Sequence, residues 1–307
     1  MILGDIMNYY KKCILCPRKC QINRYLEKGY CGCNNKIRLA LAKLFYYEEP
    51  PISGTKGSGA IFFSGCNLRC CFCQNMEISK YNKGKEISIK RLSEIMLEMQ
   101  DKGAHNINLI TPTMYIPSII KAIKKAKKKG LHLPIIYNSS GYEDINAIKL
   151  LNGYIDIYLP DFKYYDNNYA IKYSKCPNYL ENTKLSIDEM IKQVGPCIFT
   201  KNGIIQKGVI VRHLMLPSLK NDSKKIIQYL YSKYGNSIYL SIMNQYTPNK
   251  EVTFKELKKP LKEKDYNEII DYAISLGIQN AFCQFGGTVN DSFIPQFNLE
   301  GVMKKKE

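Results

Sequence analysis

The residues best suited to chemistry in this sequence are four cysteines within eight positions of one another, in the stretch GCNLRCCFCQN. Cys66, Cys70 and Cys73 follow the spacing C-x3-C-x2-C, with which a compact loop can direct three sulfurs toward one corner of a cube-shaped cluster. Cys71 is the poorest candidate for a metal ligand, because adjacent side chains tend to diverge. We expect it to pack as a small hydrophobic residue.

Two kinds of metal centre fit this loop. Iron–sulfur clusters normally have four thiolate ligands, so three thiolates on a [4Fe–4S] cube would leave one iron open for a substrate or cofactor. The alternative is a closed zinc site made by the same three cysteines and a fourth. Structural zinc loops prefer paired C-x2-C hooks, a form that only Cys70/Cys73 and Cys13/Cys16 have here. The spacing therefore favours an iron–sulfur cluster over zinc.

The loop resembles the signature of the radical S-adenosylmethionine (SAM) enzymes, C-x3-C-x-aromatic-C, with Phe72 as the aromatic residue. In that family an electron from the cluster cleaves SAM to methionine and a 5′-deoxyadenosyl radical, which abstracts hydrogen from a substrate. The resemblance implies a [4Fe–4S] cluster on Cys66, Cys70 and Cys73. It also implies SAM as cofactor, with Phe72 beside the adenine. Such chemistry requires the protein chiefly to orient the cofactor and to set its electrostatic environment.

Further segments narrow the resemblance to the branch related to pyruvate formate-lyase-activating enzymes, called the PflX type. These segments are CILCPRKCQINR, GAIFFSGCNLRCCFCQN, NLITPT, IYNSSGYE, IDIYLPDFKY and LSIMNQYTP. They extend over nearly the whole chain and imply a partial (β/α)6 TIM-like barrel, with the cluster loop after its first strand. The implied partners are a reductant such as flavodoxin or ferredoxin and, for an activating enzyme, a glycyl-radical enzyme.

Polar residues outside the loop correspond to SAM-binding positions of that branch. Asp161 and Lys163 match a D-x-K close to SAM, and Arg212 matches a basic residue near the SAM carboxylate or ribose. Asn138 stands where activating enzymes often have aspartate. The Gly-Gly-Glu that usually contacts the SAM amine is missing, and the tripeptide TPT at 111–113 occupies that strand end. The resemblance thus supports SAM cleavage more strongly than an activating enzyme's substrate, and the alternative for Asp161 and Lys163 is an ordinary ion pair.

A second group of cysteines lies near the N-terminus, in CILCPRKC and YCGC. The spacing of Cys13, Cys16, Cys20 and Cys31 can wrap a tetrahedral metal, and these four match cysteine positions of the same branch, whereas Cys33 is extra. In so short a segment, metal binding would supply much of the folding free energy. Structural zinc and an auxiliary [4Fe–4S] cluster both remain open, and the alternative is a set of free thiols in a disordered tail.

Alternating strand-like and helix-like stretches from residue 60 onward are expected to position these residues. Apolar runs predict strands at 60–64, 106–111, 133–139, 154–159, 208–216, 237–243 and 278–285. Apolar residues at helical spacing predict helices at 88–103, 117–130, 143–151, 166–194, 222–234 and 263–276. Repeated βα units without hairpin signals predict an α/β fold with a parallel sheet, either doubly wound or curled toward a barrel. In both, the working residues follow the C-terminal ends of the strands.

The N-terminal part of the chain differs from the rest. Residues 1–54 contain five cysteines, show little periodicity and end in the break EEPPISG. We therefore predict a cysteine-rich, metal-binding module at 1–54 and a radical SAM core domain at 55–307.

The chain is strongly basic, because 45 Lys+Arg against 27 Asp+Glu give a net charge of +18. Such a charge indicates affinity for nucleic acid, or else a coding bias that also explains the abundance of Ile, Asn and Tyr. No stretch approaches 18 consecutive apolar residues, and the N-terminus lacks a signal-peptide pattern. We therefore expect a cytoplasmic protein without a membrane partner, whose cysteines bind metals or react rather than form disulfides.

Three functional hypotheses follow. The first is a radical SAM oxidoreductase of the activating-enzyme kind. The second is a radical SAM enzyme that modifies RNA or a small molecule, and RNA is favoured by the net charge. The third is a zinc-stabilised nucleic-acid-binding protein without catalysis, which predicts zinc at both cysteine groups and no iron.

Overall fold

The structure of the protein is a computed structural model, described over residues 6–284 and 295–304. Within these residues, seven parallel strands form most of one sheet. In their order across the sheet they are β2 (Ser58–Phe63), β4 (Ile107–Ile110), β5 (Ile135–Ser139), β6 (Ile157–Pro160), β8 (Ile205–Leu214), β9 (Tyr239–Met243) and β10 (Ala281–Cys283). Most of their residues are buried, as expected for parallel strands with covered faces. The predicted last strand extended to Phe285, which lies outside the described residues.

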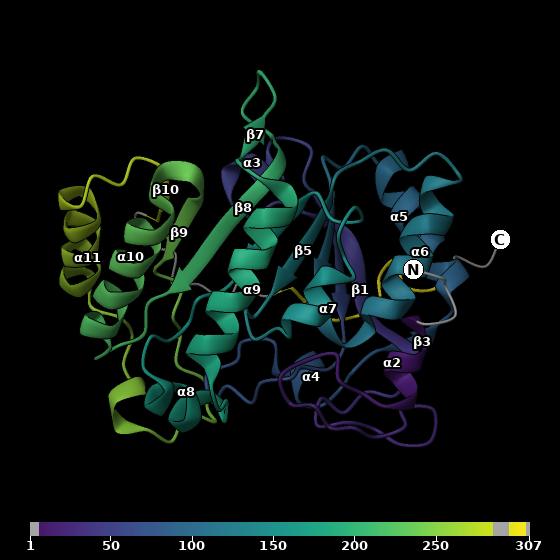
Figure 1. Cartoon of the computed structure of the whole chain (residues 1–307), viewed down its shortest axis with the longest axis horizontal. Coiled ribbons are helices and arrows are strands. Elements are labelled where there is room, and N and C mark those ends of the chain that lie inside the picture. Colours follow the sequence, from purple (N-terminus) through teal and green to yellow (C-terminus); the bar gives the residue numbers. More distant parts are fainter. Residues whose placement is uncertain (1–5, 285–294, 305–307) are drawn as a thin grey trace.

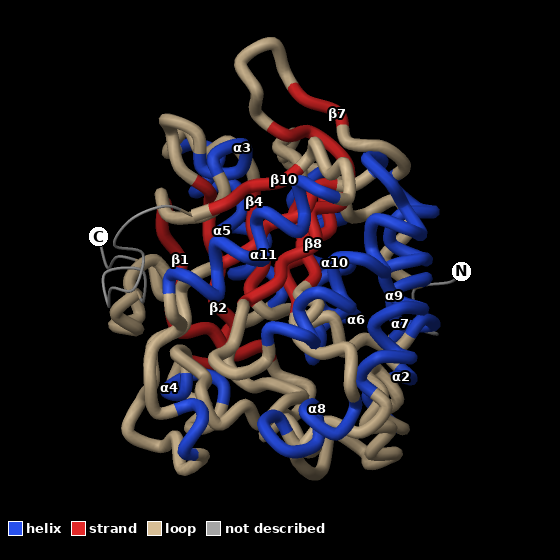
Figure 2. The backbone as a smooth tube through the Cα atoms, turned by 90° about the vertical axis from the view of Figure 1, so that its left-hand side faces the viewer, coloured by secondary structure: helices blue, strands red, loops and turns tan. Residues whose placement is uncertain are grey.

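The sheet curves into an open, partial barrel, which confirms the predicted α/β class (Figures 1 and 2). Among the described residues, no strand pairing joins β10 to the opposite end of the sheet. Larger helices surround the sheet: α5 (Ile89–Asp101), α6 (Ile116–Lys127), α7 (Ile145–Lys149), α8 (Asn167–Ser174), α9 (Tyr179–Val194), α10 (Lys220–Tyr234) and α11 (Glu263–Ser275). Their apolar faces pack inward, and Ser88 caps α5 by accepting a 3.0 Å hydrogen bond from the main-chain N–H of Arg91.

The helical region expected at 166–194 consists of two helices, α8 and α9. Lys175 ends α8 in the left-handed conformation, and Pro177 follows before α9 begins. Proline at that position cannot continue the hydrogen-bond ladder of α8. The remaining helical turns are short: α2 (Asn8–Lys11), α3 (Pro50–Ser53), α4 (Met76–Ser79), η1 (Thr113–Tyr115), η2 (Gly235–Ser237) and η3 (Lys255–Leu257).

Three antiparallel strands were not predicted. They are β1 (Ile37–Phe45), which pairs with β2, β3 (Lys85–Ile87), which pairs with β1, and β7 (Ile198–Phe199), which pairs with β8. β1 is rich in Leu and Ala, residues without strand preference, so its pairing with β2 overrides local propensity. The expectation of no hairpins was wrong at β7–β8, where Asn202 and Gly203 supply a turn between the two antiparallel strands.

The N-terminal segment packs directly on the barrel. The hydroxyl groups of Tyr10 and Ser118 of α6 are 3.0 Å apart, and β1 lies in the main sheet beside β2. Chain on both sides of residue 54 therefore shares one sheet, and the domain division at that residue stays a prediction. The described helices include none with the length and apolar character needed to cross a bilayer.

Candidate active site

The cysteine loop begins where β2 ends and is held in a specific shape. Gly65 has φ +92°, and a Cβ there would lie 2.0 Å from the Cys33 sulfur, so this position requires glycine. Arg69 donates 2.8 Å hydrogen bonds to the carbonyl oxygens of Cys66 and Leu68. The main-chain N–H groups of Arg69 and Cys71 donate to carbonyls of α8. These hydrogen bonds hold the loop in its shape without a contribution from a metal.

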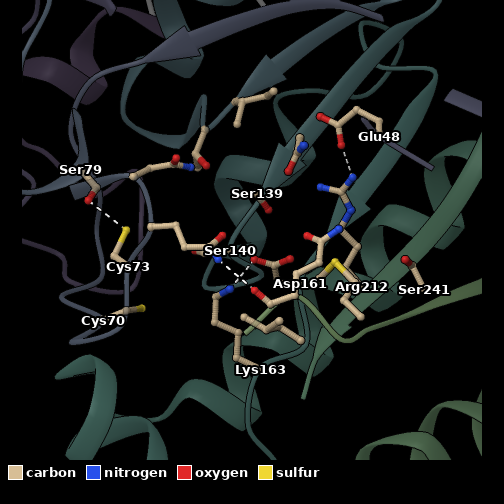
Figure 3. A pocket seen from close by; sticks show the side chains of 18 of the residues that line it. Glu48, Cys70, Cys73, Ser79, Ser139, Ser140, Asp161, Lys163, Arg212 and Ser241 are labelled. Atoms are coloured by element: carbon tan, nitrogen blue, oxygen red, sulfur yellow. Dashed lines mark hydrogen bonds and ion pairs between the residues drawn. The ribbon is translucent and has the colours of Figure 1, made fainter. Parts of the chain in front are cut away.

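Three of the four loop cysteines line one cavity of about 360 Å³ at the C-terminal ends of the parallel strands. These are Cys66, Cys70 and Cys73, whereas Cys71 is not among the described residues that line it. Figure 3 shows Cys70 and Cys73 on one side of this cavity. The loop therefore presents the three signature sulfurs to a common space and turns the fourth away.

Each of the three sulfurs has a polar neighbour. The N–H of Leu68 lies 3.4 Å from the Cys66 sulfur, the Ser174 hydroxyl donates to Cys70 over 2.9 Å, and the Ser79 hydroxyl is 3.2 Å from Cys73. Burial raises the pKa of the Cys66 thiol to about 11. Buried thiols of this kind become thiolates when a metal centre binds, and donors beside them stabilise the thiolate form.

Next to the cysteines lies an ion pair from the loop after β6. Nζ of Lys163 is 2.5 Å from Oδ2 of Asp161, and both side chains are largely buried. Burial alone would lower the pKa of Lys163, but the carboxylate of Asp161 and the nearby Cys70 sulfur keep that pKa above its ordinary value. Figure 3 shows this pair between the cysteines and Arg212. The cavity therefore has a buried ion pair beside the sulfurs, with Lys163 as its cation.

The other predicted SAM-contacting residues line the same cavity. Asn138 lies at the end of β5, and Phe72 packs edge-on against Tyr246 with ring centroids 6.0 Å apart. Phe72 and Tyr246 give this side an apolar aromatic wall, while Asn138 and Ser139 supply polar groups. The structure thus gathers all eight residues predicted for the cluster and SAM around one space.

The far end of the cavity holds two carboxylates that the sequence analysis did not single out. Glu48 and Glu49, just before α3, both form ion pairs with Arg212 of β8, and Glu48 also accepts a 2.9 Å hydrogen bond from Asn108. Burial alone would raise the pKa of Glu49, but the charge and hydrogen bonds of Arg212 hold it below its ordinary value. Their stretch of sequence, EEPP, has the local pattern of a break between domains. The signal that could have revealed Glu48 and Glu49 was Arg212 itself, because an arginine in a buried strand needs an acidic partner.

The predicted second metal ligands also come together. Cys13, Cys16, Cys20 and Cys31 line a small separate cavity, and Cys33 is not among its described lining residues. Across residues 6–284 and 295–304, no three cysteine, histidine or acidic side chains converge closely enough for a single metal ion. That holds for both cysteine groups.

Comparisons with known proteins agree with this geometry. The family model of the radical SAM superfamily matches residues 60–204. Protein MJ0674 of Methanocaldococcus jannaschii is 29% identical over 277 residues, covering 83% of this chain and 75% of that protein. The pyruvate formate-lyase-activating enzyme of Clostridium pasteurianum is 27% identical over 175 residues, covering 55% of this chain and 66% of the enzyme, just under two thirds.

Among solved structures, the [FeFe]-hydrogenase maturase HydG has a similar fold. The TM-score is 0.52 at 13% identity, over 76% of this chain and 53% of HydG. The family match includes β2, the cysteine loop, β4, β5 and β6, which form the cysteine end of the cavity. The chain thus carries a radical SAM domain over residues 60–204 and is related in sequence to the pyruvate formate-lyase-activating enzymes.

Proposed function

We propose that this protein binds a [4Fe–4S] cluster through Cys66, Cys70 and Cys73 and cleaves SAM reductively in the cavity beside them. The observation that carries the proposal is that these three sulfurs share one cavity with the Asp161–Lys163 pair and Asn138. When bound, the cluster supplies the electron that divides SAM into methionine and a 5′-deoxyadenosyl radical, which takes a hydrogen atom from the substrate.

The residues of this chain then have distinct tasks. The donors beside the three sulfurs stabilise thiolates and tune the potential of a bound cluster. Lys163 offsets negative charge beside the thiolates, and Phe72 with Tyr246 forms an apolar wall that suits an adenine. The cavity walls orient the cofactor and keep water from the reacting atoms.

Arg212 fits a different role from the contact with SAM that the family resemblance implies. Its guanidinium is already bound by two carboxylates, so little of its charge is left for a SAM carboxylate. This pairing favours a structural role, in which Arg212 holds Glu48 and Glu49 at the end of the cavity opposite the cysteines, its floor. The depth of the cavity, and with it the space left for a substrate, then depends on this ion pair.

The hydrogen donor and the electron source form the finer part of the proposal. The relationship to an activating enzyme supports a glycyl-radical enzyme as the substrate. A low-potential protein such as flavodoxin or ferredoxin would supply the electron. The missing Gly-Gly-Glu at residues 111–113 sets this chain apart from the usual activating enzyme.

The test uses anaerobically purified protein with SAM and dithionite. We expect 5′-deoxyadenosine and methionine in equal amounts, and none without the reductant. Protein that loses about four irons when Cys66, Cys70 and Cys73 are replaced by alanine, and so holds a cluster there, but forms no 5′-deoxyadenosine would overturn the proposal. The substrate is tested by adding a pyruvate formate-lyase-type enzyme and recording its glycyl radical by electron paramagnetic resonance. SAM cleavage without that radical would reject the activating role alone.

A further inference from the structure

Arg24 is a buried cation beside the N-terminal cysteines. It is only 1% exposed, and its Nη1 and Nη2 atoms donate to the carbonyl oxygens of Met114 and Asn34. Its Nε atom has no hydrogen-bond partner among the described residues. The ionisable groups that act most strongly on it are cysteines and a tyrosine, namely Cys31, Tyr10, Cys13 and Cys33. No carboxylate is among these groups.

A guanidinium in such a place needs an anion. Moving a charge from water into a protein interior costs several kcal/mol unless it is paired with an opposite charge. The carbonyl oxygens and the ring of Tyr10, 4.9 Å from the guanidinium carbon, offset part of this cost. They leave the full positive charge of Arg24 without a negative partner. The cysteines beside it are the groups that can become negative.

Four N-terminal cysteines, Cys13, Cys16, Cys20 and Cys31, are arranged around a common space. They line one cavity together with Arg24, and the point where a Cβ of Gly29 would lie is 3.6 Å from the Cys31 sulfur and 3.7 Å from the Cys20 sulfur. Paired main-chain hydrogen bonds fix the segment, from the Cys13 N–H to the Ile22 carbonyl and from the Gln21 N–H back to the Cys13 carbonyl, both 2.9 Å. The sulfurs surround a space without converging on a single point.

We propose that Cys13, Cys16, Cys20 and Cys31 hold an anionic metal–thiolate centre and that Arg24 is its buried counter-ion. Four thiolates carry more negative charge than a zinc ion or an oxidised [4Fe–4S] core carries positive charge, so either centre is an anion. Sulfurs that surround a space favour the cluster, since four irons and four sulfides hold the ligands farther apart than one ion does. This centre stands on its own residues and does not depend on SAM cleavage.

The second centre is mechanically joined to the SAM-site loop. Nε of Arg18 donates to the carbonyl of Asn67 over 2.9 Å, next to the signature cysteine Cys66. The ring of Tyr30 lies 4.0 Å from the guanidinium carbon of Arg18 and 4.6 Å from that of Arg69. Arg18 and Tyr30 also line the cavity of the second centre. A metal that orders this segment therefore also supports the backbone of the first cysteine loop.

The test begins with a full-length chain in which Cys66, Cys70 and Cys73 are all replaced by alanine, so that the first cluster cannot bind. After anaerobic purification, iron, acid-labile sulfide and zinc are measured per chain. About four irons with four sulfides would identify a cluster, and about one zinc without sulfide a single ion; either result supports the centre. A chain without metal overturns it.

Two further variants of that chain locate the ligands. Adding Cys16→Ser and Cys31→Ser should remove the metal, whereas adding Cys33→Ser should leave it in place. Cys33 is the matched control because it is buried in the same segment but is not among the described residues lining the cavity. Metal retained without Cys16 and Cys31, or lost without Cys33, contradicts the ligand set.

The counter-ion role is tested by Arg24→Met and Arg24→Lys in the same chain. Without a positive charge, the metal should pass to a chelator at least about tenfold faster, which corresponds to about 1.4 kcal/mol. The rate of metal release in Arg24→Lys should lie closer to that of the chain that keeps Arg24. A bound cluster should also show a more negative reduction potential in Arg24→Met, an effect that loss of packing alone would not produce. Equal release rates in all three chains overturn the counter-ion role.

One measurement needs no change at Arg24. Chelation should lower the urea midpoint of the chain that lacks the first cluster, because Arg24 then loses its buried anion. An unchanged midpoint after complete metal removal overturns the pairing, even if Arg24→Met does not fold.

Discussion

Arg212 and Glu49 form a two-point ion pair inside the barrel. Nε of Arg212 lies 2.7 Å from Oε1 of Glu49, and Nη2 lies 2.5 Å from Oε2. Glu48 contacts the same guanidinium, so two buried carboxylates share one cation. The pair ties β8 to the segment before α3 and closes the cavity at the end opposite the cysteines (Figure 3). A segment outside the family match, which starts at residue 60, thus helps to build the site.

Removal of Arg212 should destabilise the fold strongly. Arg212→Met leaves two carboxylates buried without a cation, and we expect the free energy of unfolding to fall by about 3–5 kcal/mol. Glu48→Gln should cost less, because Glu49 still pairs with the guanidinium. Urea unfolding of the two variants measures both effects. A loss below about 1 kcal/mol in Arg212→Met would contradict the account of the cavity floor.

Lys163 should matter for the binding of SAM more than for folding. Lys163→Met leaves the carboxylate of Asp161 unpaired beside the cysteines, where it repels the anionic cluster and the SAM carboxylate. We expect the Kd of SAM to rise about tenfold, or about 1.4 kcal/mol, while Lys163→Arg keeps most of the affinity. Anaerobic calorimetry on cluster-loaded protein measures both. Equal affinities in Lys163→Met and the unchanged protein would count against this placement of SAM.

Gly65 should tolerate no side chain. Gly65→Ala combines a positive φ with a clash against the Cys33 sulfur, whereas Gly130→Ala at φ +97° meets no atom within 4 Å. Gly130→Ala should therefore cost about 1–2 kcal/mol from backbone strain alone. Gly65→Ala should cost more and should reduce iron content as well. Similar stability and iron content in the two variants would show that the cysteine loop can shift.

His213 should make the fold sensitive to acid. It is buried, donates from Nδ1 to the Phe162 carbonyl over 2.8 Å and accepts at Nε2 from the Ser223 hydroxyl. Burial, together with the positive charge of Lys163, lowers its pKa to about 4, although the hydrogen bond to Phe162 and the carboxylate of Asp161 act to raise it. At a pH below the ordinary histidine pKa of about 6.5, this residue binds a proton in the unfolded chain but stays neutral in the folded chain.

Stability should therefore fall as the pH drops from about 6.5 to about 4, by up to about 1.4 kcal/mol per pH unit from this residue. Urea unfolding at several pH values measures this slope. His213→Gln should flatten the dependence, while the exposed His132 offers the matched control His132→Gln. An identical pH dependence in the two variants would show that His213 does not cause it.

The sequence was sufficient for the parallel sheet and for the residues around the cysteines. Buried β-branched runs and a strong cap such as Ser88 are local signals, and the structure confirms most of the predicted strands and helices, although the helix predicted at 166–194 is divided in two. It was possible to predict that Asn138, Asp161 and Arg212 lie close together, because the C-terminal ends of parallel strands meet at one edge of the sheet.

The parts that could not be predicted depend on contacts between distant segments. β1 becomes a strand because β2 offers it a partner, and Glu48 and Glu49 enter the site because Arg212 attracts them. A double proline after two glutamates has the local pattern of a linker. The role proposed for Arg24 is likewise visible only when its burial beside the cysteines is known.

The most direct test of the central claim is the yield of 5′-deoxyadenosine from SAM and dithionite in four single variants of the cysteine loop. Cys66→Ala, Cys70→Ala and Cys73→Ala should each abolish the product, because their sulfurs share the cavity. Cys71→Ala should retain it, because Cys71 is not among the described residues lining that cavity. Loss of the product in Cys71→Ala, or its persistence in any of the other three, would contradict the proposed cluster and its ligands.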